Sequence, residues 1–599
     1  MNNTLFELNV SKIKPNFPEC LYFHKQDESI YLHHNKIKVN NFEEHSNDFK
    51  IIFNTFFGAF PVENWIRYTD IDKIFIEINA KGKFVVNIWA DNGMEPPQRL
   101  KFLEIEEIEE KTIFIPINLR ELPFQRGIIF PEIRILSPDF EMSFLRYSTE
   151  ENPKKKVKLA IIMPTFKRET YVKRNVDLLQ KELLSDKNYD VHLFVIDNGQ
   201  TLEKKLLDKV SIIPNKNYGG AGGFGRGLLE VWDKDFTHIL FSDDDIEFEV
   251  ESIKRTINFF RYSKDDNVVI GGGMFNLNTK HILNEQGGFS YYMKLILAKP
   301  NRDMCNQHNV INFTYHEKIN YFGWWFFATS KDVFKKYGFP LPIFFRGDDQ
   351  EFGIRISKDT NFISLLGVGV WHEEFYKKDM PLTDYYIIRN NLILSMIHEE
   401  KSITLIKNLL RRFLGALLTY RYERAKFIVK GMEDFLKGAS FIEKTKADEY
   451  HKKLMNNQKK RPVDVKDIFV EYKFNRPLKN GFLKKVFMAL TLNGHLLPPF
   501  LIQKGKTPHD DGYVIEPLHS HRLGAIFRKE TVLYYEPTTN RGIEYKKDSS
   551  LFFRLLFKGL GKILKIYINY GDLQKDYQKV FPYITSKEFW EKYLGIRKS

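Results

Sequence analysis

Hydrophobic and polar positions divide the chain into three regions with different periodicities. In residues 1–150, short apolar runs such as "DKIFIEINA", "KFVVNIWA" and "KTIFIPIN" are separated by turn-forming residues, as in a sandwich or barrel of strands. The charged stretch "ENPKKKVKLA" follows and is typical of a linker. We therefore expect an N-terminal β-sandwich domain over residues 1–150.

From Lys158 the pattern changes to strand, turn and helix. "KLAIIMPTF", "VHLFVIDNG" and "THILFSDDD" are predicted strands, and a helix is expected around Arg174–Leu184. Strands that end in polar loops and alternate with helices indicate an α/β unit with a mostly parallel sheet. In such sheets, ligands bind beyond the carboxyl ends of the strands, where "PTFKR", "DNG" and "DDD" lie. We place this α/β domain at residues 151–392.

The remainder of the chain, residues 393–599, has apolar residues at helical spacing and is predicted to be a mostly helical domain. Within it, Leu551–Tyr570 reads "LFFRLLFKGLGKILKIYINY" and mixes leucines, aromatics and basic residues. An apolar face there would comprise Phe552, Leu555, Leu556, Leu560, Ile563 and Leu564, with Arg554, Lys558, Lys562 and Lys565 nearby. Such a helix either lies in the headgroup region of a membrane or belongs to the core of the domain.

Composition narrows the function classes without choosing one. Of 599 residues, 43% are hydrophobic and 28% charged, as in ordinary globular proteins. The 91 basic residues exceed the 77 acidic ones, which gives a formal net charge of +14. That balance suits phosphate-bearing ligands, anionic membranes or nucleic acid. The sequence has no zinc-finger, RNA-recognition or DNA-binding helix pattern, so we expect no nucleic-acid partner.

Cysteine content and the N-terminal sequence bear on the compartment. The two cysteines, Cys20 and Cys305, are too few for a disulfide framework or a cysteine-rich metal site. The N-terminal residues lack the pattern of a signal peptide, and no window of about 18 residues is continuously apolar. We expect a cytoplasmic protein.

A glycine-rich run, "NKNYGGAGGFGRG", offers one alternative function. Gly220, Gly222 and Gly225 satisfy G-x-G-x-x-G, and Asp243 follows at about the spacing of a ribose-binding acid, as in a dinucleotide-dependent oxidoreductase. However, in a dinucleotide-binding fold this run follows the first strand, whereas two predicted strands precede it here. The ribose-binding position is also normally a single acidic residue, whereas Asp243 is followed by two further aspartates. A flexible loop is the structural alternative, but glycines ahead of a helix favour close approach of the backbone to a ligand.

The triple acid itself, Asp243, Asp244 and Asp245, ends an apolar strand. If the run is extended, Asp243 and Asp245 project to one face and Asp244 to the other. Two carboxylates on one face suit a hard divalent cation, Mg²⁺ or Mn²⁺, that also holds substrate phosphates. A solvated acidic turn is the alternative.

Three further motifs lie downstream. "FFRGDDQEFGIR" places Asp348 and Asp349 before a predicted helix, whose N-terminus favours ionised carboxylates and hence a general base, or simply supplies an N-cap. "GVGVWHEEF" contains His372, and an imidazole is an acceptable Mn²⁺ ligand. "GWWFFATS" contains Trp324 and Trp325, which are either core residues or flat surfaces against which sugar rings pack.

In this order, "PTFKR", "VIDNG", "NYGGAGGFGRG", "FSDDDIEFE", "WWFF", "GDDQEFGIR" and "VWHEEF" resemble the inverting GT-A glycosyltransferases of family two. Among them, the motifs are most similar to the polymerising galactofuranosyltransferases of bacterial cell-wall galactan. The resemblance covers roughly residues 158–392. It implies an α/β, Rossmann-like GT-A core, which binds nucleotide-diphospho-sugars, between an N-terminal β-sandwich and a C-terminal helical domain.

The resemblance also implies roles for individual residues. It assigns Asp243, Asp245 and His372 as metal ligands, Asp349 as catalytic base, Arg168, Asp197, Asn217 and Asp243 as nucleotide-binding residues, and Glu285, Trp324, Trp325 and Asp348 as acceptor-facing residues.

The implied activity is transfer of galactofuranose from UDP-galactofuranose to a galactan or other cell-surface glycan, with inversion and with Mn²⁺ or Mg²⁺. Another UDP-hexose, glucose or galactopyranose, is the alternative donor, and a binding protein with an inactive core is an alternative of a different class. A lipid-linked acceptor would place the protein on the inner face of the membrane as a peripheral protein. Assembly into a homo-oligomer is compatible with the sequence.

Overall fold

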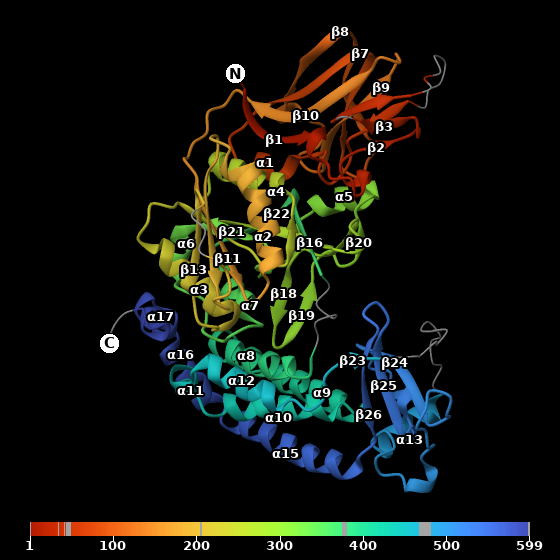
Figure 1. Cartoon of the computed structure of the whole chain (residues 1–599), viewed down its shortest axis with the longest axis vertical. Helices are drawn as coiled ribbons and strands as arrows, with labels where there is room; N and C mark the ends of the chain where they lie inside the picture. Colours follow the sequence, from red (N-terminus) through yellow and green to blue (C-terminus); the bar gives the residue numbers. More distant parts are fainter. Residues whose placement is uncertain are drawn as a thin grey trace.

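The computed structural model describes residues 2–33, 35–40, 42, 49–203, 207–373, 380–465 and 481–596. Along the chain, a β region is followed by an α/β core and then by a mainly helical region (Figure 1). The helical region lies across the end of the core that is remote from the N-terminal strands (Figure 1). The α/β core therefore contacts both flanking regions.

The N-terminal strands form one hydrogen-bonded sheet of ten strands in the described part of the chain, in which every pairing is antiparallel. Its centre is the long strand β7, which pairs with β8 along one edge and with β9 and β10 along the other. The elements are β1 Asn3–Asn9, β2 His24–Lys25, β3 Ile30–His33, β4 Lys36–Val39, β5 Lys50–Ile52, β6 Phe60–Pro61, α1 Val62–Tyr68, β7 Lys73–Asp91, β8 Gln98–Asn118, β9 Ile128–Ile135 and β10 Glu141–Thr149.

The core sheet has the order β13-β12-β11-β14-β21-β16-β17-β20, and its first four strands are parallel. In β11 every residue from Leu159 to Thr165 is buried, which explains its continuous apolar sequence: helices cover both faces of a parallel sheet. The strands are β11 Lys158–Thr165, β12 Asp190–Asp197, β13 Val210–Pro214, β14 His238–Phe241, β15 Ile246–Phe248, β16 Val268–Asn276, β17 Ile282–Glu285, β18 Gly288–Tyr291, β19 Lys294–Leu297, β20 Arg302–Asp303, β21 Phe327–Ser330 and β22 Asn361–His372.

The helices of the core are α2 Glu169–Leu179, α3 Gly219–Trp232, α4 Val250–Tyr262, α5 Gln307–Thr314, α6 Lys331–Tyr337 and α7 Asp348–Ile356. The predicted helix around Arg174–Leu184 begins earlier, at Glu169, and a single π-helical turn continues it from Gln180 to Leu184. Helix α4 joins the core to the N-terminal sheet: Asn258 Nδ2 donates a hydrogen bond of 3.0 Å to the Leu5 carbonyl.

A disulfide also links these two regions. Cys20, in the N-terminal region, is bonded to Cys305, which lies just before α5 in the core. The Cα atoms of the pair are 5.1 Å apart. The two cysteines are too few for a framework of several disulfides, as expected. Nothing in the sequence indicated that they bond to each other.

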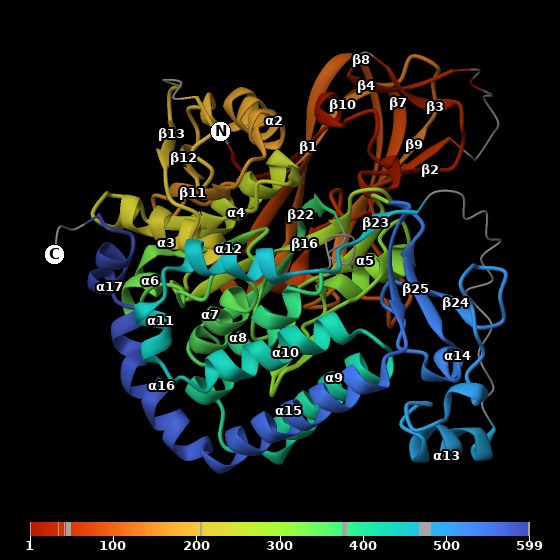
Figure 2. The same ribbon diagram turned by 60° about the horizontal axis from the view of Figure 1, so that its bottom comes forward.

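The C-terminal region is mostly helical, but it also contains a four-stranded sheet that the apolar pattern did not predict. Its helices lie beneath the core in Figure 2, and α15 packs along α9 and α10. The elements are α8 Thr383–His398, α9 Ile403–Leu418, α10 Tyr422–Phe435, α11 Ser440–Lys444, α12 Ala447–Asn457, β23 Val463–Asp464, α13 Phe482–Leu490, β24 Tyr513–Pro517, α14 Leu523–Ile526, β25 Thr531–Glu536, β26 Arg541–Lys546, α15 Ser549–Ile568, α16 Tyr570–Ile584 and α17 Lys587–Tyr593.

The segment Leu551–Tyr570 forms a helix that packs on one side against the protein. Phe552, Leu555 and Ile563, three of the residues predicted to form an apolar outer face, are buried, whereas Leu560 and Leu564 are exposed. On the same helix, Lys558 and Lys562 pair with Glu433 of α10 at 3.0 and 3.5 Å. The predicted face is therefore divided between the protein interior and solvent. Among the described residues, no helix is both long and apolar enough to span a bilayer.

Candidate metal and catalytic site

The acidic run after β14 is brought to His372 by strand pairing. Ile246, directly after the run, lies opposite His372 where β15 pairs with β22. One ligand atom each of Asp243, Asp245 and His372 lies within 4.8 Å of the other two. His372 Nε2 is 3.3 Å from Asp245 Oδ1. Two carboxylates and an imidazole at one point form a donor set that fits Mn²⁺ or Mg²⁺, and the imidazole favours Mn²⁺.

Asp244, the middle acid, has different partners. Its Oδ2 accepts a hydrogen bond of 2.7 Å from the Thr165 hydroxyl, and its Oδ1 accepts one of 2.7 Å from Arg168 Nη1. The same Arg168 nitrogen is 3.0 Å from Asp245 Oδ2. Burial raises the pKa of Asp244, and the charge of Arg168 opposes that shift. The run is a bend and not the extended strand on which the prediction of two faces depended: Arg168 Nη1 contacts both Asp244 and Asp245, although Asp244 does not belong to the group of Asp243, Asp245 and His372.

A second group of carboxylates comprises Glu285, Asp348 and Asp349. Asp348 and Asp349 are the first residues of α7, and Glu285 is the last residue of β17. Burial raises the pKa of all three, to about 8 for Glu285. The charge of Asp349 raises the pKa of both Glu285 and Asp348, so the three groups are electrostatically coupled.

Asp349 keeps the lower pKa of the adjacent pair, because the backbone N–H of Gln350 and the charge of Arg346 stabilise its ionised form. The charge of Asp243 contributes to the raised pKa of Asp348, which connects the second group to the metal ligands. Asp349 is therefore the carboxylate of this pair better suited to be an ionised base.

The loop before α7 adopts an unusual backbone conformation that α8 supports. Phe344, Arg346 and Gly347 have φ values of 76°, 68° and 90°, in the left-handed region. Asn390 Nδ2 donates to the carbonyls of Phe345 and Arg346 at 3.0 and 2.7 Å. Arg389 Nη2 donates to the Ile343 carbonyl at 2.7 Å.

Arg346, Arg389 and Asn390 were not predicted as site residues from the sequence. A signal was available: "RNN" interrupts the apolar run of α8, and polar residues buried in a helix need partners.

The glycines of α3 mainly allow neighbouring elements of the protein to pack closely against this helix. A Cβ atom at Gly223 would lie 2.4 Å from Pro164 of β11, and one at Gly227 would lie 2.2 Å from Ile162 of the same strand. At Gly225 it would lie 2.6 Å from the Trp590 ring of α17. Gly220 differs, because a Cβ atom there would have Asp348 Oδ2 as its nearest neighbour, at 3.7 Å. Only this end of the run faces the site, and α3 follows β13 at the sheet edge, which argues against the dinucleotide alternative.

The remaining nucleotide-binding candidates lie at the same end of the sheet. Asp197 ends β12, and β12 pairs in parallel with β11 so that Asp197 lies opposite Thr165. Its carboxylate accepts hydrogen bonds from the backbone N–H groups of Gly199 and Leu202 at 3.0 and 2.8 Å. Asn217 Oδ1 accepts one of 3.1 Å from Gly219. Both side chains shape loops here, and their contact with a nucleotide stays a prediction.

Trp324 and Trp325 are not an open surface in this structure. Each is only 4% exposed. The Trp324 ring packs edge-on against Phe224 and Phe241, with centroids 5.0 Å away in both cases. Trp325 Nε1 donates to the Gly272 carbonyl at 2.8 Å. The structure thus favours the core interpretation over the sugar-stacking one for Trp324, because aromatic rings already occupy its surroundings.

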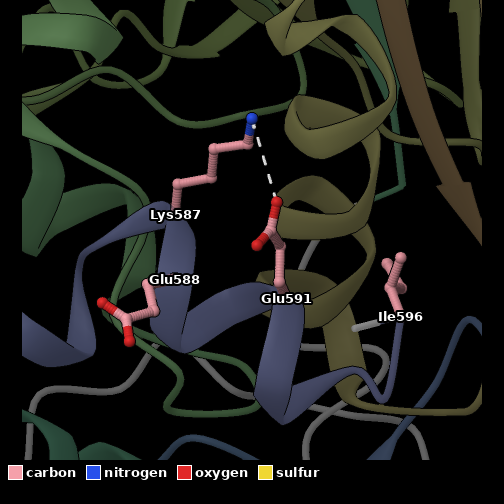
Figure 3. A pocket seen from close by; sticks show the side chains of 4 residues that line it. All are labelled: Lys587, Glu588, Glu591 and Ile596. Atoms are coloured by element: carbon pink, nitrogen blue, oxygen red, sulfur yellow. Dashed lines mark ion pairs between the residues drawn. The ribbon is translucent and has the colours of Figure 1, made fainter. Parts of the chain in front are cut away.

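A cavity of about 550 Å³ lies elsewhere, at α17, and is lined by Lys587, Glu588, Glu591 and Ile596 (Figure 3). Lys587 pairs with Glu591 at 3.8 Å and with Asp233 at 2.7 Å. Two of its three charged residues, Lys587 and Glu591, are thus paired with each other, and none of the candidate site residues lines it.

Residues 160–324 match the family model of glycosyl transferase family 2. The chain contains a family 2 glycosyltransferase domain. The matched segment includes Asp243 and Asp245 but ends before Asp349 and His372. The fold predicted from the sequence is confirmed: a GT-A-type α/β core with a preceding β region and a C-terminal helical region.

Two galactofuranosyltransferases are similar to this chain. The GlfT2 protein of Mycobacterium tuberculosis is 24% identical over 597 residues, which cover 90% of each chain. The GlfT2 protein of Mycolicibacterium smegmatis is 25% identical over 419 residues, which cover 65% of this chain and 64% of the relative. The chain is thus related to galactofuranosyltransferases at modest identity.

Solved structures give partial likenesses. The mannosyltransferase PcManGT of Pyrobaculum calidifontis, in complex with GDP-Man and Mn²⁺, has a TM-score of 0.27 at 10% identity and covers 51% of this chain and 81% of its own. S. aureus TarS residues 1–349 have a TM-score of 0.29 at 12% identity, covering 52% and 95%.

Proposed function

We propose that this glycosyltransferase transfers galactofuranose from UDP-galactofuranose to a hydroxyl of a cell-surface glycan, with inversion at the anomeric carbon. The observation that carries the proposal is the meeting of Asp243, Asp245 and His372 within 4.8 Å, next to a coupled carboxylate pair at the start of α7. The relationship to galactofuranosyltransferases supports the choice of donor.

Asp243, Asp245 and His372 would hold Mn²⁺ or Mg²⁺. The ion, when bound, neutralises charge that develops on the diphosphate as the bond to the sugar breaks. Arg168 lies beside the same carboxylates and adds a fixed positive charge at this end of the sheet. These residues would provide cationic and metal-binding groups for the diphosphate of a bound donor.

Asp349 would act as the general base. Its ionised carboxylate takes the proton from the acceptor hydroxyl, and that oxygen attacks the anomeric carbon on the face opposite the departing UDP. Asp348 and Glu285, whose pKa values are raised further, hold protons more tightly and can donate hydrogen bonds to acceptor oxygens. Correct orientation of the two sugars supplies much of the remaining rate.

A panel of UDP-sugars, assayed with and without EDTA, tests the proposal. We expect UDP release with UDP-galactofuranose and Mn²⁺, and inversion is read from the anomeric configuration of the product by NMR. Faster release of UDP from UDP-glucose or UDP-galactopyranose would show that the donor is a different sugar nucleotide. The proposed metal ligands and base would then be unchanged. Absence of UDP release with every donor and with Mn²⁺ would indicate a binding protein and overturn the proposal.

A further inference from the structure

Phe344, in the loop before α7, has a left-handed backbone conformation that bulky residues rarely adopt. Its φ is 76°, and such a conformation persists only where the surrounding structure holds it. The residue is buried, and the loop leads directly to Asp348 and Asp349, the first residues of α7. The backbone at Phe344 therefore decides how the chain enters the helix that carries two of the candidate site residues.

The carbonyl group of Phe344 also contacts the start of α3. It accepts a hydrogen bond of 3.1 Å from the backbone N–H of Ala221. Gly219 leaves room for this carbonyl, because a Cβ atom at Gly219 would lie 2.1 Å from the Phe344 oxygen. A Cβ atom at Gly220, between these two residues, would have Asp348 Oδ2 as its nearest neighbour. Phe344 thus connects the glycine-rich helix to the second group of carboxylates.

Two aromatic residues of the C-terminal helices pack on the Phe344 ring. Its centroid is 4.4 Å from that of His451 in α12 and 5.5 Å from that of Tyr386 in α8, and both pairs are stacked. A hydrogen bond of 2.9 Å joins His451 Nδ1 and the Tyr386 hydroxyl group. Burial lowers the pKa of His451 to about 4, so its ring is uncharged at neutral pH. Both helices lie below α7 in Figure 1.

The other support of this loop does not reach Phe344 itself. Among the described residues, Asn390 Nδ2 donates to the carbonyls of Ile343, Phe345 and Arg346, but not to that of Phe344. The conformation of Phe344 therefore depends on its packed ring and on its hydrogen bond with α3.

We propose that His451 and Tyr386 are positioning residues for glycosyl transfer: they hold Phe344 in its left-handed conformation and thereby fix Asp349 relative to the start of α3. The inference rests on the proposed function, in which Asp349 is the base. Without the two rings, Phe344 relaxes to a negative φ, its carbonyl turns away from Ala221, and the first turn of α7 shifts. A displacement of about 1 Å at a reacting group is enough to lower a rate about 100-fold.

Helix α12 has anchors of its own, so His451 can be replaced without releasing the helix. Leu454 is 3% exposed and packs in the same apolar cluster as Phe344. The Tyr450 hydroxyl group donates a hydrogen bond to Asp434 of α10. A variant at His451 therefore tests the ring contact and not the presence of α12.

Steady-state kinetics of the full chain test the proposal. H451A should lower kcat about 10–100-fold, with a smaller change in the KM for the UDP-sugar. H451F keeps an aromatic ring against Phe344 and should restore kcat to within about threefold of the wild type. K452A, which removes the exposed side chain next to His451, is the matched control and should behave as the wild type. Equal kcat in H451A and the wild type would overturn the proposal.

Hydrogen exchange supplies a readout that does not depend on turnover. In H451A the amide of Ala221 should exchange at least about tenfold faster, because its acceptor moves, whereas the amides of β11 keep their protection. Unchanged exchange at Ala221 would overturn the proposal even if kcat fell, since His451 would then act by another route. Equally faster exchange in β11 would also overturn it, because the whole core would be destabilised. If the wild type releases no UDP, the proposed function fails, whereas the exchange comparison still tests the contact with Phe344.

Discussion

The two carboxylate groups of the site are stabilised in different ways. In the first, Arg168 contacts Asp244 and Asp245 directly at 2.7 and 3.0 Å, and His372 lies beside Asp245. In the second, burial raises the pKa of Glu285, Asp348 and Asp349, the charge of Asp349 raises the pKa of the other two further, and the charge of Arg346 opposes the shifts of Glu285 and Asp349. Cationic partners keep one group ready for a metal, whereas burial and the charge of Asp349 let the other hold and release protons.

Removing a ligand from the first group should have the largest effect. D245A leaves one carboxylate and one imidazole, and we expect kcat to fall about 10³–10⁵-fold, the equivalent of several kcal/mol of charge stabilisation. The measurement is UDP-sugar turnover against Mn²⁺ concentration, with thermal unfolding as a check on folding. Wild-type turnover of D245A, or of the wild type in EDTA, would contradict the metal assignment.

In the second group, D349N should lower kcat about 10²–10⁴-fold, because only proton removal is lost. Binding of the UDP-sugar, measured by calorimetry, should change little. D348N is the matched control, since it alters the neighbouring carboxylate on the same helix turn. If D348N abolishes turnover and D349N does not, the two roles are reversed.

The geometry of the second group depends on the loop held by Asn390. N390A removes hydrogen bonds to three carbonyls of this loop, those of Ile343, Phe345 and Arg346, and misplacement of the base by about 1 Å should lower kcat about 10–100-fold with a smaller change in KM. N391A is the control, because its side chain bonds only to the Ile387 carbonyl of its own helix in the described contacts. Equal effects of N390A and N391A would exclude a specific positioning role.

The charge of Arg346 near the second carboxylate group predicts that its removal will shift the pH dependence of kcat. Arg346 favours the ionised form of Asp349, so R346M should raise the pKa of Asp349 and move the acidic limb of the kcat–pH profile to higher pH. R346K keeps the charge and should move the limb less. An unchanged limb in R346M would show that another group controls it.

The smallest effect is expected on stability. Burial and the charge of Asp349 raise the pKa of Glu285 from 4.5 to about 8, so between these pH values the folded state keeps a proton that the unfolded state releases. Stability therefore falls as pH rises through this window. E285Q removes this loss, and its Tm relative to wild type should increase by about 1–3 °C between pH 5 and pH 9. A pH-independent difference would contradict the raised pKa.

The sequence predicted what depends on local pattern and motif order. The buried strand β11 was predicted because a short stretch encodes it, and the grouping of Asp243, Asp245 and His372 follows from the family resemblance. The helix near Asp348 was also predicted, but it begins at Asp348 itself and not after Asp349. The bonds from α8 to the loop before α7, and the burial of Trp324, depend on contacts between distant segments. The C-terminal sheet has strands of only two to six residues, too short for a clear periodicity.

The contact between Gly225 and Trp590 has a consequence for the order of synthesis. Trp590 follows all the candidate site residues in the sequence, its indole N–H donates to the Pro340 carbonyl at 3.1 Å, and its ring lies against the glycine-rich helix beside the site. A ribosome therefore releases the candidate metal ligands and base before it releases the residue that packs behind this helix. The helix obtains its full set of packing partners only after the site residues have emerged.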